Sequence, residues 1–221
     1  MAPNTPNTPS EGWVAALRRF IEPAPNIARC ELCSLELMER HPHLIAIDDR
    51  RLLCACDACA LLYSGDAQKF RRVPRDSARL DDFQMSDEHW AGLGIPVGIA
   101  FFFKSTRDQR VVAIYPGAAG AMESLLDLST WGVLEDANPV LREIETDVEA
   151  LLANHLDGAR DYYRMPLDRC YALSGLIRST WSGFTGGSEM REAVAQFFAD
   201  AVPACDSVRR VAMPDAVEQH A

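Results

Sequence analysis

Two closely spaced pairs of cysteines are the residues of this chain best suited to chemistry. The first pair is Cys30-Glu-Leu-Cys33, the second is Cys56-Asp-Ala-Cys59, and 22 residues lie between them. Each Cys-x-x-Cys pair forms a tight turn, and two such turns can place four thiolates at the corners of a tetrahedron. This is the geometry of a structural zinc ion, so the sequence predicts a four-cysteine metal site.

Zinc is the ion that this pattern favours, and iron held by the same cysteines is the alternative. A rubredoxin-type iron site usually has glycine after each pair and proline within the second pair. Here Ser34 and Ala60 occupy the glycine positions, and Asp57 occupies the proline position. With four protein ligands the site is closed, because no coordination position remains for water or substrate. We therefore expect a structural support, and such a zinc site contributes roughly 10–16 kcal/mol to folding.

Three further residues in the same stretch have side chains that can bind metals. Cys54 lies two residues before Cys56. It can replace a neighbouring ligand, help to hold an iron–sulfur cluster, or pack as a buried thiol under a hairpin. His41 and His43 can act as alternative ligands, belong to a ββα-metal nuclease centre, or be exposed residues of a turn. The nuclease is disfavoured, because the later part of this region offers no partner for the histidines.

The residues between the two pairs must bring the four thiols together. Leu44–Ile47 and Arg51–Cys54 are β-prone, and Asp48–Arg50 between them is typical of a hairpin turn. The second pair leads into a predicted helix at Cys59–Tyr63. A turn, a hairpin and a second turn on a helix follow the order of a treble-clef zinc module, whereas a zinc ribbon has a strand after the last pair. We expect a treble-clef or zinc-ribbon-like module at residues 28–76.

The rest of the chain is predicted to form a mixed α+β domain at residues 86–202, so the fold class is α+β. Periodicity and capping residues give its elements. The predicted strands are residues 94–103, 110–115 and 160–165, and the predicted helices are residues 86–93, 122–128 and 138–152. Two more helices are expected to begin at caps formed by Asp168 and Ser188. The remaining segments are a disordered tail at residues 1–10, a short helix and linker at residues 11–27, and a flexible tail at residues 203–221.

The charge of the chain argues against nucleic acid as a partner. Asp and Glu number 32 against 22 Lys and Arg, and the net charge of −10 repels phosphate backbones. The longest apolar segment, residues 95–103, is about half as long as a membrane-spanning helix, and the N-terminus lacks the pattern of a signal peptide. Five of the seven cysteines lie within 30 residues, unlike a secreted disulfide framework. We expect a cytoplasmic protein with neither nucleic acid nor membrane as partner.

No catalytic constellation stands out in the sequence. Gly-x-Ser-x-Gly and His-Glu-x-x-His motifs are absent. Pro116–Gly120 lacks the Lys-Ser/Thr ending of a nucleotide-binding loop, so we interpret it as an ordinary turn. Cys170 lies on an apolar helical stripe and is expected in the core, and Cys205 is a lone thiol near the C-terminus. The sequence therefore favours a protein that is not an enzyme.

Several segments together resemble a known but uncharacterised bacterial family. They are Cys30–Leu37, His43-Leu, Arg51–Leu62, Arg71-Arg-Val-Pro74, Leu93–Phe103, Tyr115-Pro116 and Asp168-Arg-Cys-Tyr171. The family is mainly actinobacterial and is encoded among the accessory genes of NiFe uptake hydrogenases. The resemblance covers roughly residues 28 to 200. It implies cytoplasmic association with a hydrogenase and a role in its assembly or electron supply, and it transfers no catalytic residue.

These observations lead to one principal hypothesis and two alternatives. The principal hypothesis is a zinc-stabilised, non-catalytic accessory protein that binds a protein partner, a NiFe hydrogenase subunit or maturation factor. Docking would use the second domain and a basic patch at Lys69, Arg71, Arg72 and Arg75. The first alternative is a rubredoxin-like or iron–sulfur electron-transfer module at the same cysteines. The second is an enzyme with an unrecognised site in the α+β domain.

Overall fold

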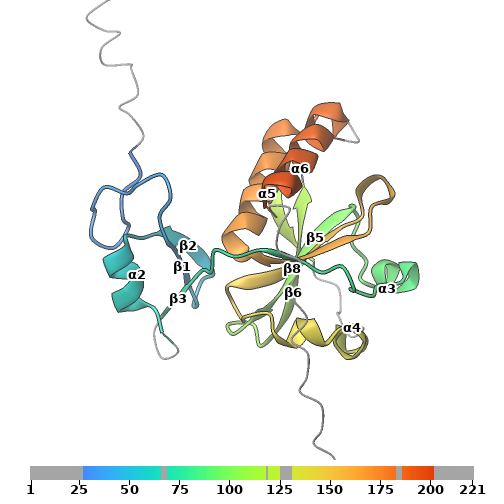
Figure 1. Ribbon diagram of the computed structural model, residues 1–221, viewed down its shortest axis with the longest axis horizontal. Coiled ribbons are helices and arrows are strands. Elements are labelled where there is room, and N and C mark those ends of the chain that lie inside the picture. Colours follow the sequence, from blue (N-terminus) through green and yellow to red (C-terminus); the bar gives the residue numbers. More distant parts are fainter. Residues whose placement is uncertain (1–26, 66–68, 118, 125–130, 183–185, 202–221) are drawn as a thin grey trace, which may run out of the picture.

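A computed structural model describes most of the chain, namely residues 27–65, 69–117, 119–124, 131–182 and 186–201. These residues form a three-stranded sheet and a separate six-stranded sheet flanked by helices (Figure 1). The predicted α+β class is confirmed, with four clustered cysteines preceding a β-rich domain. The predictions for residues 1–10, 11–26 and 203–221 fall outside the described residues.

The first unit, which we call the metal module, comprises residues 28–65 and 69–76. Its strands pair antiparallel in the order β2-β1-β3. Its elements are β1 (His43–Ala46), β2 (Arg51–Cys54), α2 (Asp57–Tyr63) and β3 (Phe70–Arg72). Leu44, Leu53, Ala55 and Ala60 are buried against three of the cysteines. Such a small apolar core supplies little stability on its own, so this unit needs a further source of stability.

The second unit, the sheet domain, is a six-stranded antiparallel sheet in the order β4-β9-β8-β5-β6-β7. Its strands are β4 (Ala78–Arg79), β5 (Ile99–Ser105), β6 (Arg110–Gly117), β7 (Gly120–Glu123), β8 (Glu149–Asn154) and β9 (Asp161–Pro166). Its helices are α3 (Asp87–Gly92), α4 (Trp131–Ala137), α5 (Leu167–Thr180) and α6 (Gly187–Ala201), with 3-10 turns at Pro139–Arg142 and Leu156–Gly158. Every helix among the described residues is too short or too polar to traverse a bilayer.

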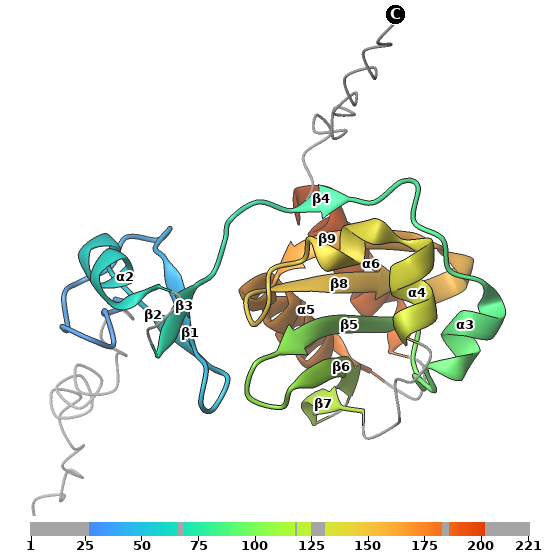
Figure 2. The same cartoon turned by 90° about the horizontal axis from the view of Figure 1, so that it is seen from below.

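Helices cover both faces of this sheet, because its central strands carry apolar side chains on both faces. Phe101 and Phe103 lie in one core cluster with residues of α5 and α6. Phe102 points the other way and lies in a second cluster with residues of α4. Figure 2 shows α4 in front of β8 and β5, with α5 and α6 behind them. The predicted apolar segment ending at Phe103 is therefore a central strand of a three-layer domain.

The predicted helix at residues 138–152 is wrong. Only Pro139–Arg142 is helical, as a short 3-10 turn, and Glu149–Asn154 is strand β8. All six residues of β8 are buried, because both of its faces are covered. A strand buried on both faces has no alternating pattern, and an apolar run of this length does not distinguish a strand from a buried helix.

Two other predicted elements also differ from the structure. The helix predicted at residues 122–128 is wrong at its start, because Gly120–Glu123 is strand β7. Residues 125–128 lie outside the described residues. The strand expected from residue 94 begins only at Ile99. Gly94 has a φ of +61°, a left-handed conformation that glycine adopts readily and that ends the preceding helix.

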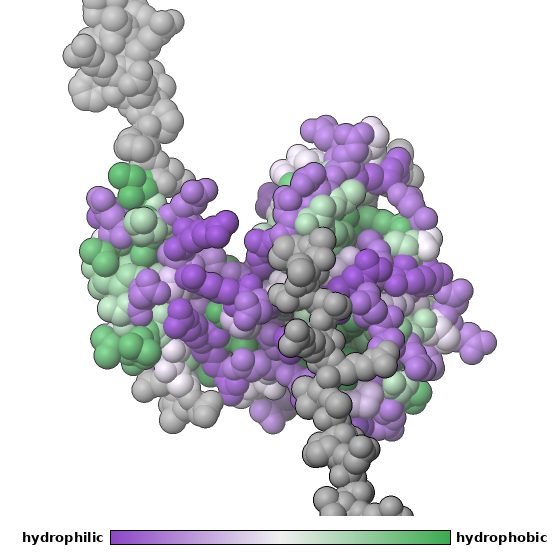
Figure 3. All heavy atoms as spheres, viewed as in Figure 1, coloured by the Kyte–Doolittle hydropathy of each residue, from purple (hydrophilic) through white to green (hydrophobic). Residues whose placement is uncertain are grey.

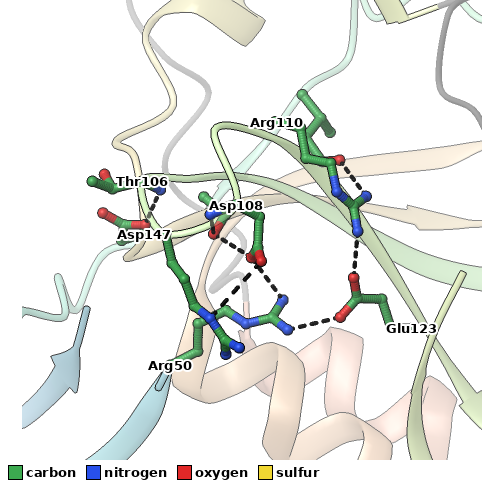
Figure 4. Close-up of polar contacts among 9 residues, drawn as sticks. Arg50, Thr106, Asp108, Arg110, Glu123 and Asp147 are labelled. Carbon is green, nitrogen blue, oxygen red and sulfur yellow. Dashed lines mark hydrogen bonds and ion pairs between the residues drawn. The ribbon is translucent and has the colours of Figure 1, made fainter. Parts of the chain in front are cut away.

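The hairpin tip of the metal module contacts the sheet domain through Arg50. Its Nη2 lies 2.7 Å from Oε2 of Glu123, and its Nη1 lies 3.6 Å from Oδ2 of Asp108. Arg110 binds the other oxygen of Glu123 at 2.6 Å (Figure 4). The Arg50 side chain is only 19% exposed. This ion pair is thus partly shielded from water. Charge-assisted hydrogen bonds are stronger in such a site than on the open surface.

Further contacts join the units, and one of them corrects the predicted basic patch. Ile45 and Val73 of the metal module are buried in the same core cluster as Phe101 and Phe103. Nε of Arg71 lies 3.5 Å from Oδ2 of Asp147, whose side chain is 4% exposed. Arg71 is therefore used inside the chain and is not part of a free docking surface. Nδ1 of His43 lies 2.6 Å from Oδ2 of Asp168, at the start of α5.

Replacing Arg50 with alanine is expected to loosen the metal module from the sheet domain. The change removes the hydrogen bond to Glu123, and bonds to charged groups contribute about 1.5–3 kcal/mol. Small-angle scattering should report a larger radius of gyration, and proteases should cut faster near residues 73–77. Arg51→Ala is the matched control, because that side chain is 59% exposed and its ion pairs contribute little. Equal effects of the two substitutions would contradict this role of Arg50.

Candidate metal centre

The four cysteines of the two pairs meet at one point of the metal module. The Sγ atoms of Cys30, Cys33, Cys56 and Cys59 all lie within 4.8 Å of one another. The Cys33 and Cys56 sulfurs are 3.7 Å apart. Four sulfurs bound to one tetrahedral zinc ion at 2.3 Å lie about 3.8 Å apart. The cluster therefore fits a single metal ion of this kind with little movement.

The two pairs reach the cluster through different local structures. In the first, Ser34 donates its backbone N–H to the Cys30 carbonyl at 2.8 Å and has a φ of +64°. This is the left-handed turn in which glycine is usual. In the second, Cys56 is the N-cap of α2, and its Sγ accepts a hydrogen bond from the Cys59 N–H at 3.4 Å. The second pair thus begins a helix and does not repeat the turn of the first.

The protonation of these thiols depends on their close packing. Burial raises the pKa of Cys30, but hydrogen bonds to the backbone around Cys56, Leu32 and Cys33 outweigh it and lower that pKa to about 6. Burial, together with the neighbouring sulfurs, raises the pKa of Cys59 to about 12. Several thiolates so close together repel one another, and a divalent cation removes that repulsion. The protonation of the four thiols is therefore typical of a metal site, in which the bound ion stabilises the thiolates.

His41, His43 and Cys54 are not members of the four-cysteine cluster. Their candidate ligand atoms form a separate group, all within 4.8 Å of one another. Cys54 is partly exposed, so it is not the buried thiol under the hairpin that was one of its three expected roles. His41 and His43 are likewise half-buried and not exposed turn residues. The alternative in which these residues replace a cysteine ligand does not match this arrangement.

Sequence reasoning missed two features of this second group. The hairpin register places His43 directly opposite Cys54, which the length of the turn could have indicated. The contact between His43 and Asp168 joins residues 125 positions apart. No local signal predicts it. The sequence suggested that Asp168 caps a helix, but α5 begins at Leu167 with Pro166 as its N-cap, so Asp168 lies within the first turn of the helix. The remaining thiols are Cys170, which is buried in the core as expected, and Cys205, which lies outside the described residues.

Comparison with known proteins gives a family but no activity. The model of a family of unknown function, DUF5947, matches residues 29–204, which is most of the chain. No curated protein and no solved structure gives a significant match. The matched region contains both cysteine pairs and every strand and helix of the sheet domain.

Proposed function

Because the chain belongs to the family of unknown function DUF5947, we propose its role from its geometry: a zinc-stabilised accessory protein that binds another protein. The four-sulfur cluster is closed, so its ion would hold the metal module together and would not bind a substrate. The module then presents a rigid surface next to the sheet domain. No catalytic role is part of this proposal.

Zinc suits the site better than iron for a local reason. A rubredoxin-type iron site has two similar turns that surround the ion with backbone N–H groups, which tune its potential. Here the second pair instead begins α2, with Ala60 fully buried inside the helix. Zinc requires only four thiolates in a tetrahedron. The arrangement therefore supports a structural ion over an electron carrier.

The observation that carries the interaction role is the distribution of exposed apolar side chains. Eight large apolar residues are exposed among the described residues, and five of them lie in the metal module, although it is the smaller unit. They are Leu35, Met38, Leu61, Leu62 and Tyr63. Figure 3 shows this concentration as green atoms over the module at the left. Exposed apolar side chains concentrated in this way are typical of protein-binding surfaces.

The partner that we propose is a subunit or a maturation factor of a NiFe hydrogenase. The sequence resemblance described above suggests this partner, and the apolar side chains of the module supply a surface of suitable chemistry. Leu61 and Leu62 on α2 are 74% and 69% exposed. We expect them to be buried in the complex, where apolar area removed from water contributes about 25 cal/mol per Å².

Affinity purification from cells that express both this protein and a NiFe hydrogenase tests the proposal. The wild-type protein should recover hydrogenase subunits or maturation factors, and the double variant Leu61→Glu/Leu62→Glu should lose them. Val133→Glu is the matched control, because Val133 is 54% exposed but lies on α4 of the sheet domain. Recovery of no hydrogenase protein by the wild type would count against the partner.

Metal analysis tests the zinc assignment separately. The purified protein should contain zinc and have no visible absorption, because zinc is colourless and ferric thiolate is red. Iron at the four cysteines, with a visible thiolate band, would replace this proposal with the electron-transfer alternative.

A further inference from the structure

We propose that His41, His43 and Cys54 form a second metal site, which binds one divalent transition-metal ion through three protein ligands. The proposal goes beyond the zinc-stabilised role, because this site differs from the four-cysteine cluster in its ligands and in its open coordination position. Its candidate ligand atoms all lie within 4.8 Å of one another. Bound to one tetrahedral ion, these atoms would lie about 3.3–3.6 Å apart.

The hairpin of the metal module builds this site. His43 is the first residue of β1, Cys54 is the last residue of β2, and the two are directly opposite in the antiparallel register. Side chains of such a pair project from the same face, with Cβ atoms about 4.5–5.5 Å apart. The Pro42 carbonyl accepts a hydrogen bond from the Ala55 N–H at 2.9 Å, which extends the pairing towards His41. The rings of His41 and His43 meet edge to face at 4.9 Å.

Both histidines are oriented as metal ligands usually are. Nδ1 of His43 lies 2.6 Å from the Asp168 carboxylate, and Nδ1 of His41 lies 2.8 Å from the Met38 carbonyl. Each acceptor fixes the proton on Nδ1, so Nε2 presents its lone pair for coordination. Nε2 of His41 is also buried and has no hydrogen-bond partner within the described part of the chain. A bound cation would satisfy this otherwise unpaired atom.

The ligand set selects a class of ion. Two imidazoles and one thiolate suit zinc, cobalt, nickel or copper, whereas calcium and magnesium prefer oxygen ligands. Three protein ligands leave a fourth position of a tetrahedral ion for water or a small molecule. This arrangement is typical of metal sites that bind exchangeable ligands, in contrast to the closed four-sulfur cluster.

A cavity gives access to the site from solvent. It has a volume of about 450 Å³ and lies between the metal module and the sheet domain. His41, His43 and Asp168 line it, together with Arg40, Arg75 and Arg169. Glu39 and Asp200 line the cavity as well, so its walls carry charges of both signs, and water or a small molecule entering it could occupy the fourth position on the ion. The site thus joins the two units, because its ligands come from the module and the carboxylate that orients His43 comes from α5.

Cobalt titration of the full-length, zinc-containing protein tests the proposal. Tightly bound zinc should keep the four-cysteine cluster filled, and Co²⁺ should then bind one further site per chain. We expect a thiolate-to-cobalt charge-transfer band and the visible bands of four-coordinate cobalt. Cys54→Ser should abolish the charge-transfer band, and His41→Gln should weaken cobalt binding by about 100-fold or more. Circular dichroism and zinc content should confirm that both variants remain folded.

The orienting role of Asp168 has its own test. Asp168→Asn should weaken cobalt binding by about 10–100-fold while the charge-transfer band remains, because a partner that orients a ligand affects affinity more than coordination. Arg50→Ala is the control for looser docking of the two units and should change affinity much less. A zinc-containing wild type that binds no cobalt, or a Cys54→Ser variant with an unchanged cobalt spectrum, would overturn the second site only. Absence of zinc from the wild type would overturn the proposed function instead.

Discussion

Replacing Cys56 with serine is expected to unfold the metal module and leave the sheet domain folded. Cys56 has two roles, as one of the four clustered thiols and as the N-cap of α2. Serine is a good N-cap, so the helix start is preserved and only the thiolate is lost. Structural zinc contributes roughly 10–16 kcal/mol to folding of such sites. The small apolar core of the module cannot replace that contribution.

Two measurements check this expectation. Elemental analysis should show that zinc is lost from Cys56→Ser, and NMR spectra should show collapsed amide shifts for the module with dispersed shifts for the sheet domain. Cys54→Ser is the matched control, because it removes a thiol only two residues away that is outside the cluster. It should retain zinc in the four-cysteine cluster. A Cys56→Ser protein with full zinc content and a folded module would refute the closed four-sulfur site.

Replacing Phe102 with alanine should produce the second largest loss, about 3–5 kcal/mol in the free energy of unfolding of the sheet domain. Phe102 is completely buried on β5, and its ring centroid lies 5.5 Å from that of Trp131 on α4. The substitution removes this contact and leaves a cavity between the sheet and α4. Because β5 is central in the sheet, the neighbouring strands cannot close around the space.

Urea unfolding followed by tryptophan fluorescence measures this loss. Phe102→Leu is the matched control, since it nearly conserves volume and should cost less than about 1.5 kcal/mol. Zinc content should stay unchanged in both variants, because the metal module has its own core. Similar losses for alanine and leucine would contradict the packing of Phe102 against α4.

The sequence alone was sufficient for the four-cysteine cluster and its local supports. Its ligands come in two short-range pairs, and the hairpin between β1 and β2 is governed by its own turn residues. The helix after the second pair is also local, because Cys56 provides its cap. Interactions between residues close in sequence can be predicted without knowledge of the tertiary structure.

Only the tertiary structure decided the remaining features. Glu149–Asn154 is a strand because it pairs with β5 and β9 while helices cover both of its faces, which overrides the helical spacing of its apolar residues. Arg71 belongs to an internal ion pair because Asp147 lies against it from a distant loop. His43 is oriented by Asp168, far away along the chain, where packing of α5 against the sheet places that carboxylate. Such contacts depend on which distant surfaces pack together, and no local pattern of residues contains that information.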